Sequence, residues 1–273
     1  MYIIFRVILS FLHFAYSFQY FVQQQYTRFL LFIERCTRSS KVKSNYSSLK
    51  FNENLINVPK IPRHLAFLLG HEEVSVLDVV KLISWCVVAE IPFISFYDHK
   101  GNLQKNQVFI KKRISEMEPS ISKNIEWPSV SGKATNGVKN VAIANKDVYT
   151  NNKNSKVGDV SEHRTKVYFL SYADCKGRIV SVTKSLAKVN NSSIFQEESI
   201  TPEFLDKQLS ISNDTPNPDL AIVFGKTMCT YGFLPWQTRI TEFFTFPTHH
   251  DVSSDGFIKT LVKFSKCQQR YGK

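Results

Sequence analysis

The sequence contains none of the short motifs that mark many large enzyme families. It has no G-x-S-x-G turn for a nucleophilic serine, no G-x-x-x-x-G-K-[ST] phosphate loop and no G-x-G-x-x-G dinucleotide fingerprint. Carboxylates are also scarce at the ends of the predicted strands, where an open α/β sheet normally places its site. These absences leave no catalytic site that motifs alone would reveal.

Paired cysteines and metal-spaced histidines are missing as well. The five cysteines are odd in number, widely scattered and contain no C-x-x-C. They are Cys36, Cys86, Cys175, Cys229 and Cys267. This usage predicts free thiols in a reducing compartment. His249 and His250 are adjacent, and on a strand their side chains would point to opposite faces, so we expect no metal site.

Acidic residues are rare near the N-terminus, which makes the formal net charge of +12 uneven along the chain. Residues 1–50 carry 7 basic and 1 acidic residues, and residues 104–166 carry 12 and 6. The remaining residues balance to zero. We therefore assign the basic charge to an N-terminal segment and a polar insert. A nucleic-acid groove would place it on the folded core, so we expect no nucleic-acid partner.

An apolar stretch opens the chain. Residues 2–22 contain Arg6 as their only formal charge and are long enough to span a bilayer. A cleaved signal peptide is the alternative, with a site near residues 15–17. The basic residues that follow are Arg28, Arg35, Arg38, Lys41 and Lys43, against Glu34. By the positive-inside rule, residues 1–25 are then a single-pass anchor, 26–58 a basic juxtamembrane linker, and the C-terminal domain is cytosolic.

From residue 59 to 273 the pattern alternates between short apolar runs and amphipathic segments. Strands are predicted at 65–69, 93–97, 165–172, 217–225 and 241–247, and helices at 75–91, 178–189, 201–210 and 254–268. Strand–helix–strand units of this length predict an α/β domain with a mostly parallel central sheet flanked by helices. Residues 129–164 are rich in Asn, Lys and Ser with little periodicity, which predicts a disordered polar insert.

Three separated stretches resemble the cis-prenyltransferase family. They are "IPRHLAFLLG", "NPDLAIVFGKTMCTYGFLPWQTRITEF" and the terminal "RYG". Within the family they are most similar to its non-catalytic branch, the Nogo-B receptor type subunit of the dehydrodolichyl diphosphate synthase complex. The resemblance covers about residues 59–103 and 167–273 and implies the fold of that family.

The first departure from the catalytic members falls at Gly70. Active members run H-x-A-x-x-M-D-G-N along the first strand, and the aspartate holds Mg²⁺ on the allylic diphosphate, as a hard oxygen ligand should. Counted from His64, that position is Gly70, followed by His71 and Glu72. Glycine has no ligand atom, and we expect Glu72 to lie in an exposed turn and point elsewhere. The resemblance therefore implies that Mg²⁺ is held mainly by a catalytic partner.

The second departure removes the arginines that clamp diphosphate in the family motif D-L-x-I-R-T-S-G-E-x-R. In register from Asp219, residues 223–229 here read VFGKTMC. The planar fork of arginine suits phosphate oxygens, and both arginines are absent. Glu242 matches a family glutamate near the metal, but alone it makes no site.

What remains is the C-terminal Arg270-Tyr271-Gly272. In the family, this R-x-G reaches across a dimer interface and binds isopentenyl diphosphate in the partner's site. A glycine C-cap is the simpler interpretation of the same residues. The resemblance also assigns part of the aromatic-rich segment to a dimer interface, with Phe233, Leu234, Trp236, Arg239 and Phe244 as candidates.

The function that follows is a non-catalytic, membrane-anchored subunit of a heteromeric cis-prenyltransferase. By resemblance it lies in the endoplasmic reticulum membrane and supports long-chain polyprenyl diphosphate synthesis for dolichol and protein glycosylation. One alternative is a membrane-tethered binding or receptor module with a vestigial enzyme fold. Another is a self-sufficient prenyltransferase with an unusual site built on Glu72 and Glu242.

Overall fold

The computed structural model describes residues 2–38, 55, 58–70, 72–128, 130, 164–190, 200–250 and 252–268. The chain divides into two units, Met1–Ser48 and Leu49–Lys273. Most of the predicted insert (129–164) and of the predicted linker (26–58) lies outside the described residues, as do Arg270 and Gly272.

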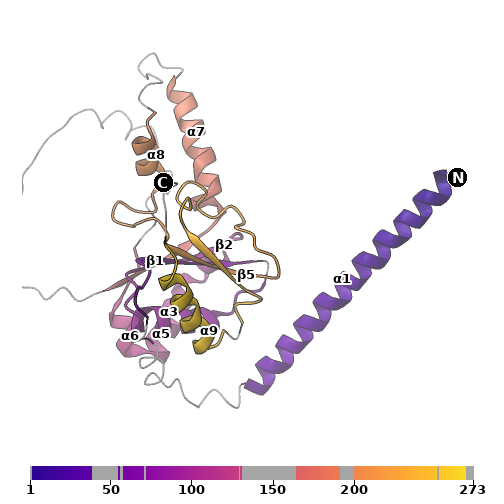
Figure 1. Ribbon diagram of the computed structural model, residues 1–273, viewed down its shortest axis with the longest axis horizontal. Helices are drawn as coiled ribbons and strands as arrows, with labels where there is room; N and C mark the ends of the chain where they lie inside the picture. The colour runs from indigo at the N-terminus through magenta and orange to yellow at the C-terminus, as the bar shows by residue number, and fades with distance from the viewer. Residues whose placement is uncertain are drawn as a thin grey trace, which may run out of the picture. The chain divides into compact units, whose positions relative to one another are not determined.

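The first unit contains one long helix, α1 (Tyr2–Arg38), drawn in indigo in Figure 1. Its described apolar side chains point outward along the whole N-terminal half; Ile3, Phe5 and Phe11, for example, are 76%, 73% and 68% exposed. Among the described residues, no helix combines the length and apolarity needed to cross a bilayer. The transmembrane prediction for residues 2–22 is thus not confirmed.

The second unit is built on a six-stranded sheet in the order β3-β4-β2-β1-β5-β6 (Figure 1). Its strands are β1 (His64–Leu69), β2 (Phe93–Asp98), β3 (Ile125–Glu126), β4 (Thr165–Leu170), β5 (Leu220–Phe224) and β6 (Glu242–Phe246). Every pairing between neighbours is parallel. The predicted parallel α/β sheet is therefore confirmed, with all five predicted strands in place.

Helices connect the strands, and three of them begin at a side-chain cap. They are α3 (Val76–Val88), α4 (Asn102–Lys105), α5 (Gln107–Met117), α6 (Pro119–Lys123), α7 (Lys176–Asn190), α8 (Pro202–Leu209) and α9 (Ser254–Ser265), with a 3₁₀ turn η1 (Tyr172–Asp174). The hydroxyls of Ser75, Thr201 and Ser253 accept from backbone N–H groups of the first turn. The last helix ends three residues before the predicted end at 268.

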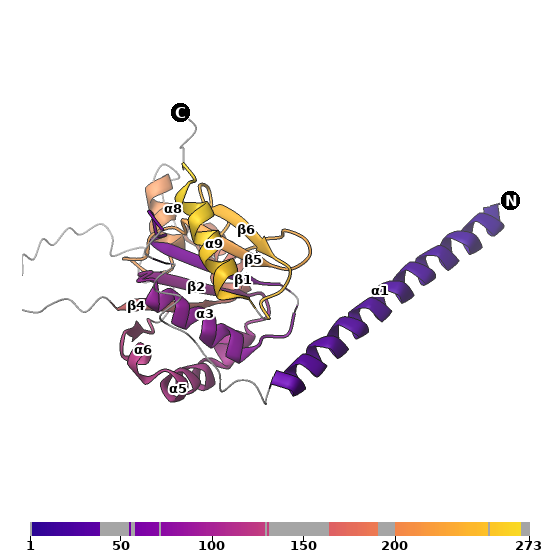
Figure 2. The ribbon, with the colours of Figure 1, turned by 60° about the horizontal axis from the view of Figure 1, so that its bottom comes forward.

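Alternating strand residues supply two cores, one on each face of the sheet. Phe67 of β1 stacks on Phe96 and Phe224 of the neighbouring strands, with ring centroids 4.8 and 6.1 Å apart. The same face packs against α3, α5 and α9 (Figure 2), and Trp85 of α3 contacts Phe257 of α9 at 5.6 Å. A fully buried phenylalanine contributes about 1.5–3 kcal/mol, so this aromatic stack is a main source of stability.

The opposite face carries a smaller core that ends at the loops following the strands. Ala66 and Leu68 of β1 pack there with Tyr97 and Tyr168. The loop residues Phe233 and Leu234 complete this core, each 1% exposed. The loop after β5 is thus an integral part of the fold.

His64 is fully buried at the start of β1. Its Nδ1 donates to the carbonyl of Pro216 at 2.7 Å, and its Nε2 accepts from the hydroxyl of Ser95 at 2.8 Å. Burial lowers the pKa of His64 to about 4, outweighing the Pro216 hydrogen bond and the charge of Asp219, which raise it. The imidazole is therefore neutral near pH 7 and ties β1 to β2 and to the segment before β5.

The segment 102–123 differs from the sequence-based expectation, which assigned the basic charge of 104–166 to a polar insert. It forms α4, α5 and α6, so five of those basic residues lie on folded helices: Lys105, Lys111, Lys112, Arg113 and Lys123. These helices bury few apolar positions, chiefly Leu103, Ile110 and Ile114. Such a sparse stripe is too weak to predict a helix from sequence.

Candidate functional site

The carboxyl ends of the parallel strands meet at one edge of the sheet. From β1 the chain crosses to β2 on one side, while β5 lies on the other side of β1. In open α/β sheets, ligands bind outside the carboxyl ends at such a reversal of strand order. A site is therefore expected among the residues that follow β1 and β5, beginning with Gly70 and Gly225.

Gly70 follows β1 directly, and its surroundings leave no room for a side chain. A Cβ built there would lie 2.6 Å from the carbonyl oxygen of Phe224 and 3.3 Å from the hydroxyl of Tyr231. The first distance is far below van der Waals contact and involves backbone, which cannot easily shift. Position 70 therefore excludes an aspartate by packing, in addition to lacking a carboxylate.

The loop after β5 is held in place by a hydrogen bond from β2. The hydroxyl of Tyr97 donates to the carbonyl of Tyr231 at 2.6 Å. Burial raises the pKa of Tyr97 well above its usual range, so the hydroxyl stays protonated and remains a donor.

The backbone of this loop adopts unusual dihedral angles over three neighbouring residues. Tyr231, Gly232 and Leu234 have φ values of 52°, 82° and 29°. In addition, the N–H of Lys176 donates to the carbonyl of Gly232 at 3.2 Å. Left-handed conformations at non-glycine residues persist only where surrounding contacts hold them. These contacts hold the loop after β5 in place at the carboxyl edge of the sheet, where the family site is expected.

Residues 223–229, which align with the family's arginine motif, are partly buried and partly exposed. Val223 and Phe224 are buried in β5, whereas residues 226–229 are exposed. Lys226 is the one basic residue in this stretch. Neither arginine of the family motif is replaced by a buried, positioned guanidinium here.

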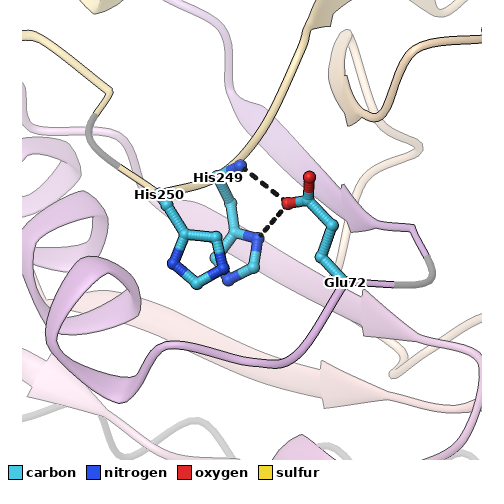
Figure 3. A group of neighbouring side chains, drawn as sticks. All are labelled: Glu72, His249 and His250. Carbon is cyan, nitrogen blue, oxygen red and sulfur yellow. Dashed lines mark hydrogen bonds and ion pairs between the residues drawn. The ribbon is translucent and has the colours of Figure 1, made fainter. Parts of the chain in front are cut away.

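Glu72 is not an exposed turn residue, contrary to the prediction. Its Oε2 accepts from His249 Nδ1 at 2.9 Å and from the His249 backbone N–H at 3.3 Å (Figure 3). The same oxygen accepts from the Thr248 hydroxyl at 2.8 Å. Burial would raise the pKa of Glu72, but the hydrogen bonds from His249 and Thr248 outweigh it and the pKa is lowered. Glu72 is an ionised carboxylate that accepts hydrogen bonds from the connection between β6 and α9.

The premise that placed His249 and His250 on a strand is also wrong. β6 ends at Phe246, and both histidines lie in the connection that follows. Their ring centroids are 4.0 Å apart, and both rings are buried. A turn lets adjacent side chains point the same way, which a strand does not.

Glu72 and Glu242 lie at opposite ends of the sheet. Glu242 begins β6 and pairs with Leu220 at the amino end, whereas Glu72 follows the carboxyl end of β1. Four strand residues separate Glu242 from the carboxyl end of β6, a span of about 13 Å. Within one chain these carboxylates do not share a metal ion, which contradicts the alternative of a self-sufficient site built on both.

Two cavities among the described residues also lack paired carboxylates. One, of about 480 Å³, lies beside the ends of β2 and β4. Its lining is His99, Lys100, Gly101, Gln104, Lys105, Ser171, Tyr172 and Ala173, with no acidic residue. The other, of about 510 Å³, lies near the amino end of β1 and the end of α9, with Asp219 as its single acidic residue.

A sequence model of the family described as putative undecaprenyl diphosphate synthase matches residues 63–272. This match spans most of the chain and all the strands of the sheet. The chain belongs to the cis-prenyltransferase family. Position 70 and the loop after β5 are thus departures inside a family fold.

Among curated relatives, the mouse protein named dehydrodolichyl diphosphate synthase complex subunit Nus1 is 27% identical over 232 residues, covering 84% of this chain and 72% of the relative. The human NUS1 subunit is 27% identical over 219 residues, covering 80% and 69%. The Schizosaccharomyces pombe nus1 subunit is 28% identical over 218 residues, covering 78% of each chain.

The fold of the family is also seen in a solved structure. Lavandulyl diphosphate synthase from Lavandula x intermedia, crystallised with dimethylallyl diphosphate, superposes with a TM-score of 0.52. The alignment covers 78% of this chain and 98% of that chain at 16% identity. At this identity the likeness shows the fold alone.

The candidate interface residues divide into two groups. Phe233 and Leu234 are buried inside this chain and belong to its own core. The others are accessible: Trp236 and Phe244 are half-buried, and Arg239 is exposed. The Trp236 indole N–H donates to Asp206, whose carboxylate also pairs with Arg239 at 3.6 Å. Arg239 lies over the Trp236 ring at 5.1 Å.

Proposed function

We propose that this chain is the non-catalytic, membrane-anchored subunit of a heteromeric cis-prenyltransferase of the dehydrodolichyl diphosphate synthase type. The complex makes long-chain polyprenyl diphosphate for dolichol and protein glycosylation. The curated relatives named above, three Nus1 subunits of that complex, support this assignment. The observation that carries the non-catalytic role is the 2.6 Å approach of a Cβ at position 70 to the Phe224 carbonyl.

The residues of this chain do not fit the Mg²⁺ that the family implies. Magnesium requires several oxygen ligands in near-octahedral geometry. Gly70 supplies none, Glu72 has the nitrogen donors of His249 and His250 beside it, and Glu242 lies at the other end of the sheet. In this proposal, Mg²⁺ and the allylic substrate therefore belong to the catalytic partner.

In this proposal Arg270 and Gly272 act in the partner's isopentenyl diphosphate site. A glycine lets its backbone N–H approach a diphosphate closely, and a guanidinium supplies two parallel donors with a fixed positive charge. Such groups orient the homoallylic substrate and stabilise the diphosphate leaving group.

The exposure of helix α7 supports the proposal that a partner chain binds there. None of the described side chains of α7 is buried, although the helix runs for 15 residues. Ile179, Val182 and Leu186 recur at helical spacing and are only half-buried. An amphipathic helix stabilises a fold mainly by burying such a stripe. Together with Trp236, Arg239 and Phe244, this stripe supports a heteromeric interface.

The membrane anchor and the endoplasmic reticulum location belong to the proposal. The support is the run of exposed apolar side chains on α1, including Ile3, Phe5 and Phe11. Resistance of the full chain to alkaline extraction from membranes would indicate a spanning anchor. If the chain stays on the membrane at neutral pH but is released by alkali, its attachment is peripheral.

The deciding experiment measures isopentenyl diphosphate incorporation by three samples: this chain alone, a catalytic cis-prenyltransferase subunit alone, and the two co-purified. We expect elongation with the pair, much less with the catalytic subunit alone and none with this chain alone. Mg²⁺-dependent elongation by this chain alone would overturn the non-catalytic role. Equal activity of the partner with and without this chain would favour a binding or receptor module.

A further inference from the structure

The side chains of Glu72, His249 and His250 converge at the carboxyl edge of the sheet (Figure 3). One ligand atom from each lies within 4.8 Å of the other two. They come from two connections far apart in sequence, between β1 and α3 and between β6 and α9. Small side-chain movements would bring ligand atoms at these distances close enough to bind one ion.

His250 is oriented as a metal ligand would be. Its Nδ1 lies 3.6 Å from Oδ2 of Asp78, and these two side chains are 10% and 11% exposed. A carboxylate beside one ring nitrogen holds the proton there and leaves the lone pair on the other, Nε2. Metal-ligating histidines in proteins commonly have this carboxylate–imidazole arrangement behind them.

Glu72 retains acceptor capacity beyond its present hydrogen bonds. All three bonds, from the Thr248 hydroxyl and the two His249 N–H groups, reach the same oxygen, Oε2. An ionised carboxylate offers about four acceptor positions on two oxygens.

Ligation of a metal ion by His249 would affect the start of α3. Its Nδ1 donates to Glu72 and its Nε2 accepts from the Ser75 N–H at 3.0 Å, which fixes the tautomer with the proton on Nδ1. Ligation through Nδ1 moves that proton to Nε2 and breaks the Ser75 bond. Ser75 is the N-cap of α3, so binding would alter the first turn of that helix.

We propose that Glu72, His249 and His250 bind a divalent transition metal of the Zn²⁺ class, with water completing the coordination. Two imidazoles and one carboxylate are typical Zn²⁺ ligands, whereas Mg²⁺ prefers oxygen donors throughout. Asp78 is the positioning residue for His250. This proposal does not rest on the proposed function.

The test titrates the full chain with Zn²⁺ by calorimetry and with Co²⁺ by visible absorption. Cys36, Cys229 and Cys267 are first replaced by serine so that thiolates do not bind the probe metals. We expect one ion per chain and Co²⁺ bands without sulfur-to-metal charge transfer. Millimolar Mg²⁺ should not displace Zn²⁺.

Variants then locate the ion. His250→Ala and Glu72→Gln should weaken Zn²⁺ binding at least 10-fold, and Asp78→Asn 10- to 100-fold, in line with the usual effect of removing a carboxylate behind a ligand. His99→Ala, at an exposed histidine after β2, is the matched control and should bind as the parent does. Each variant is first shown to unfold cooperatively at a similar denaturant concentration.

Two results would overturn the proposal. One is the absence of stoichiometric Zn²⁺ or Co²⁺ binding by the folded parent, a measurement that needs no variant. The other is equal binding by the parent, His250→Ala and Glu72→Gln. Either would show that this cluster is a hydrogen-bond network without a metal.

Discussion

The hydroxyl of Tyr97, at the carboxyl end of β2, donates a 2.6 Å hydrogen bond to the carbonyl of Tyr231 in the loop after β5. These residues are 134 positions apart in the chain. The bond holds Tyr231 beside Gly70, where the family places a catalytic aspartate. The packing of this loop leaves no room at position 70 for that aspartate.

Tyr97→Phe should lower the free energy of unfolding by about 1 kcal/mol, because it removes the hydrogen bond that the buried Tyr97 donates to the Tyr231 carbonyl. Denaturant unfolding followed by circular dichroism measures the change. Tyr172→Phe, at an exposed ring, is the matched control and should change stability by less than about 0.5 kcal/mol. Equal effects of both variants would contradict the assigned role of the bond.

Gly70→Asp should not create prenyltransferase activity, and Gly70→Ala alone should destabilise the fold by roughly 1–3 kcal/mol through overpacking. The cause is the contact of the new Cβ with the Phe224 carbonyl. Thr227→Asp, exposed on the neighbouring loop, introduces the same charge without the contact and should be nearly neutral. A fully stable Gly70→Asp protein would show that the edge has room for a side chain.

His64 should make the protein less stable as the pH falls from about 6.5 toward 4. The unfolded chain takes up a proton on this imidazole near its ordinary pKa of 6.5, whereas the folded pKa is about 4. More protons are bound by the unfolded state in this window, so stability rises with pH there and is fully present above it. The full difference is at most about 3 kcal/mol.

The measurement is a series of denaturant midpoints between pH 4 and 7.5 for the parent and His64→Gln. The substitution should lower stability at pH 7 and flatten the dependence between pH 6.5 and 4. Glu72 and Asp78 also have lowered pKa values, so they contribute stability that is lost at more acidic pH. An unchanged slope in His64→Gln would remove His64 as the cause.

Arg270→Ala in the co-purified complex should reduce isopentenyl diphosphate incorporation about 30- to 1000-fold. This follows from the roughly 2–4 kcal/mol of transition-state stabilisation that one charged clamp contributes. Assembly, followed by size-exclusion chromatography, should be unchanged. Lys273→Ala removes a nearby charge outside the R-x-G and should retain activity. Full activity of Arg270→Ala would reject the proposed role of the tail.

Deletion of residues 129–159 should leave assembly and activity near normal. Ile125 of β3 and Thr165 of β4 are paired neighbours, so the two strands that this connection joins lie about 5 Å apart. The shortened connection keeps residues 127, 128 and 160–164, which span that distance easily. Loss of the complex on deletion would show that the insert takes part in assembly.

The sheet was predictable because its strands are apolar on both faces and its helices begin at clear caps. The runs 65–69 and 220–224, and Ser75 before α3, are local signals that packing then reinforces. Helices α4–α6 were missed because they bury so few apolar residues. Their helical state follows from packing of α5 and α6 against α3 and of α4 against β2 and β4, which sequence periodicity does not report.

The site was only partly predictable, since its decisive contacts join distant segments. The absence of a carboxylate at Gly70 is visible in the sequence, but the position of the Phe224 carbonyl beside it is not. The pairing of Glu72 with His249 joins residues 177 positions apart. The adjacent histidines were the available signal, and the assumption that they lay on a strand concealed it.

The filling of position 70 by Phe224 and Tyr231 has an evolutionary consequence. Regaining the aspartate in one mutational step would introduce a steric clash before it could restore any catalysis. To accommodate the family aspartate at position 70, the loop after β5 would have to move first. Under the proposed function, a lineage carrying this arrangement depends on another gene product for the reaction.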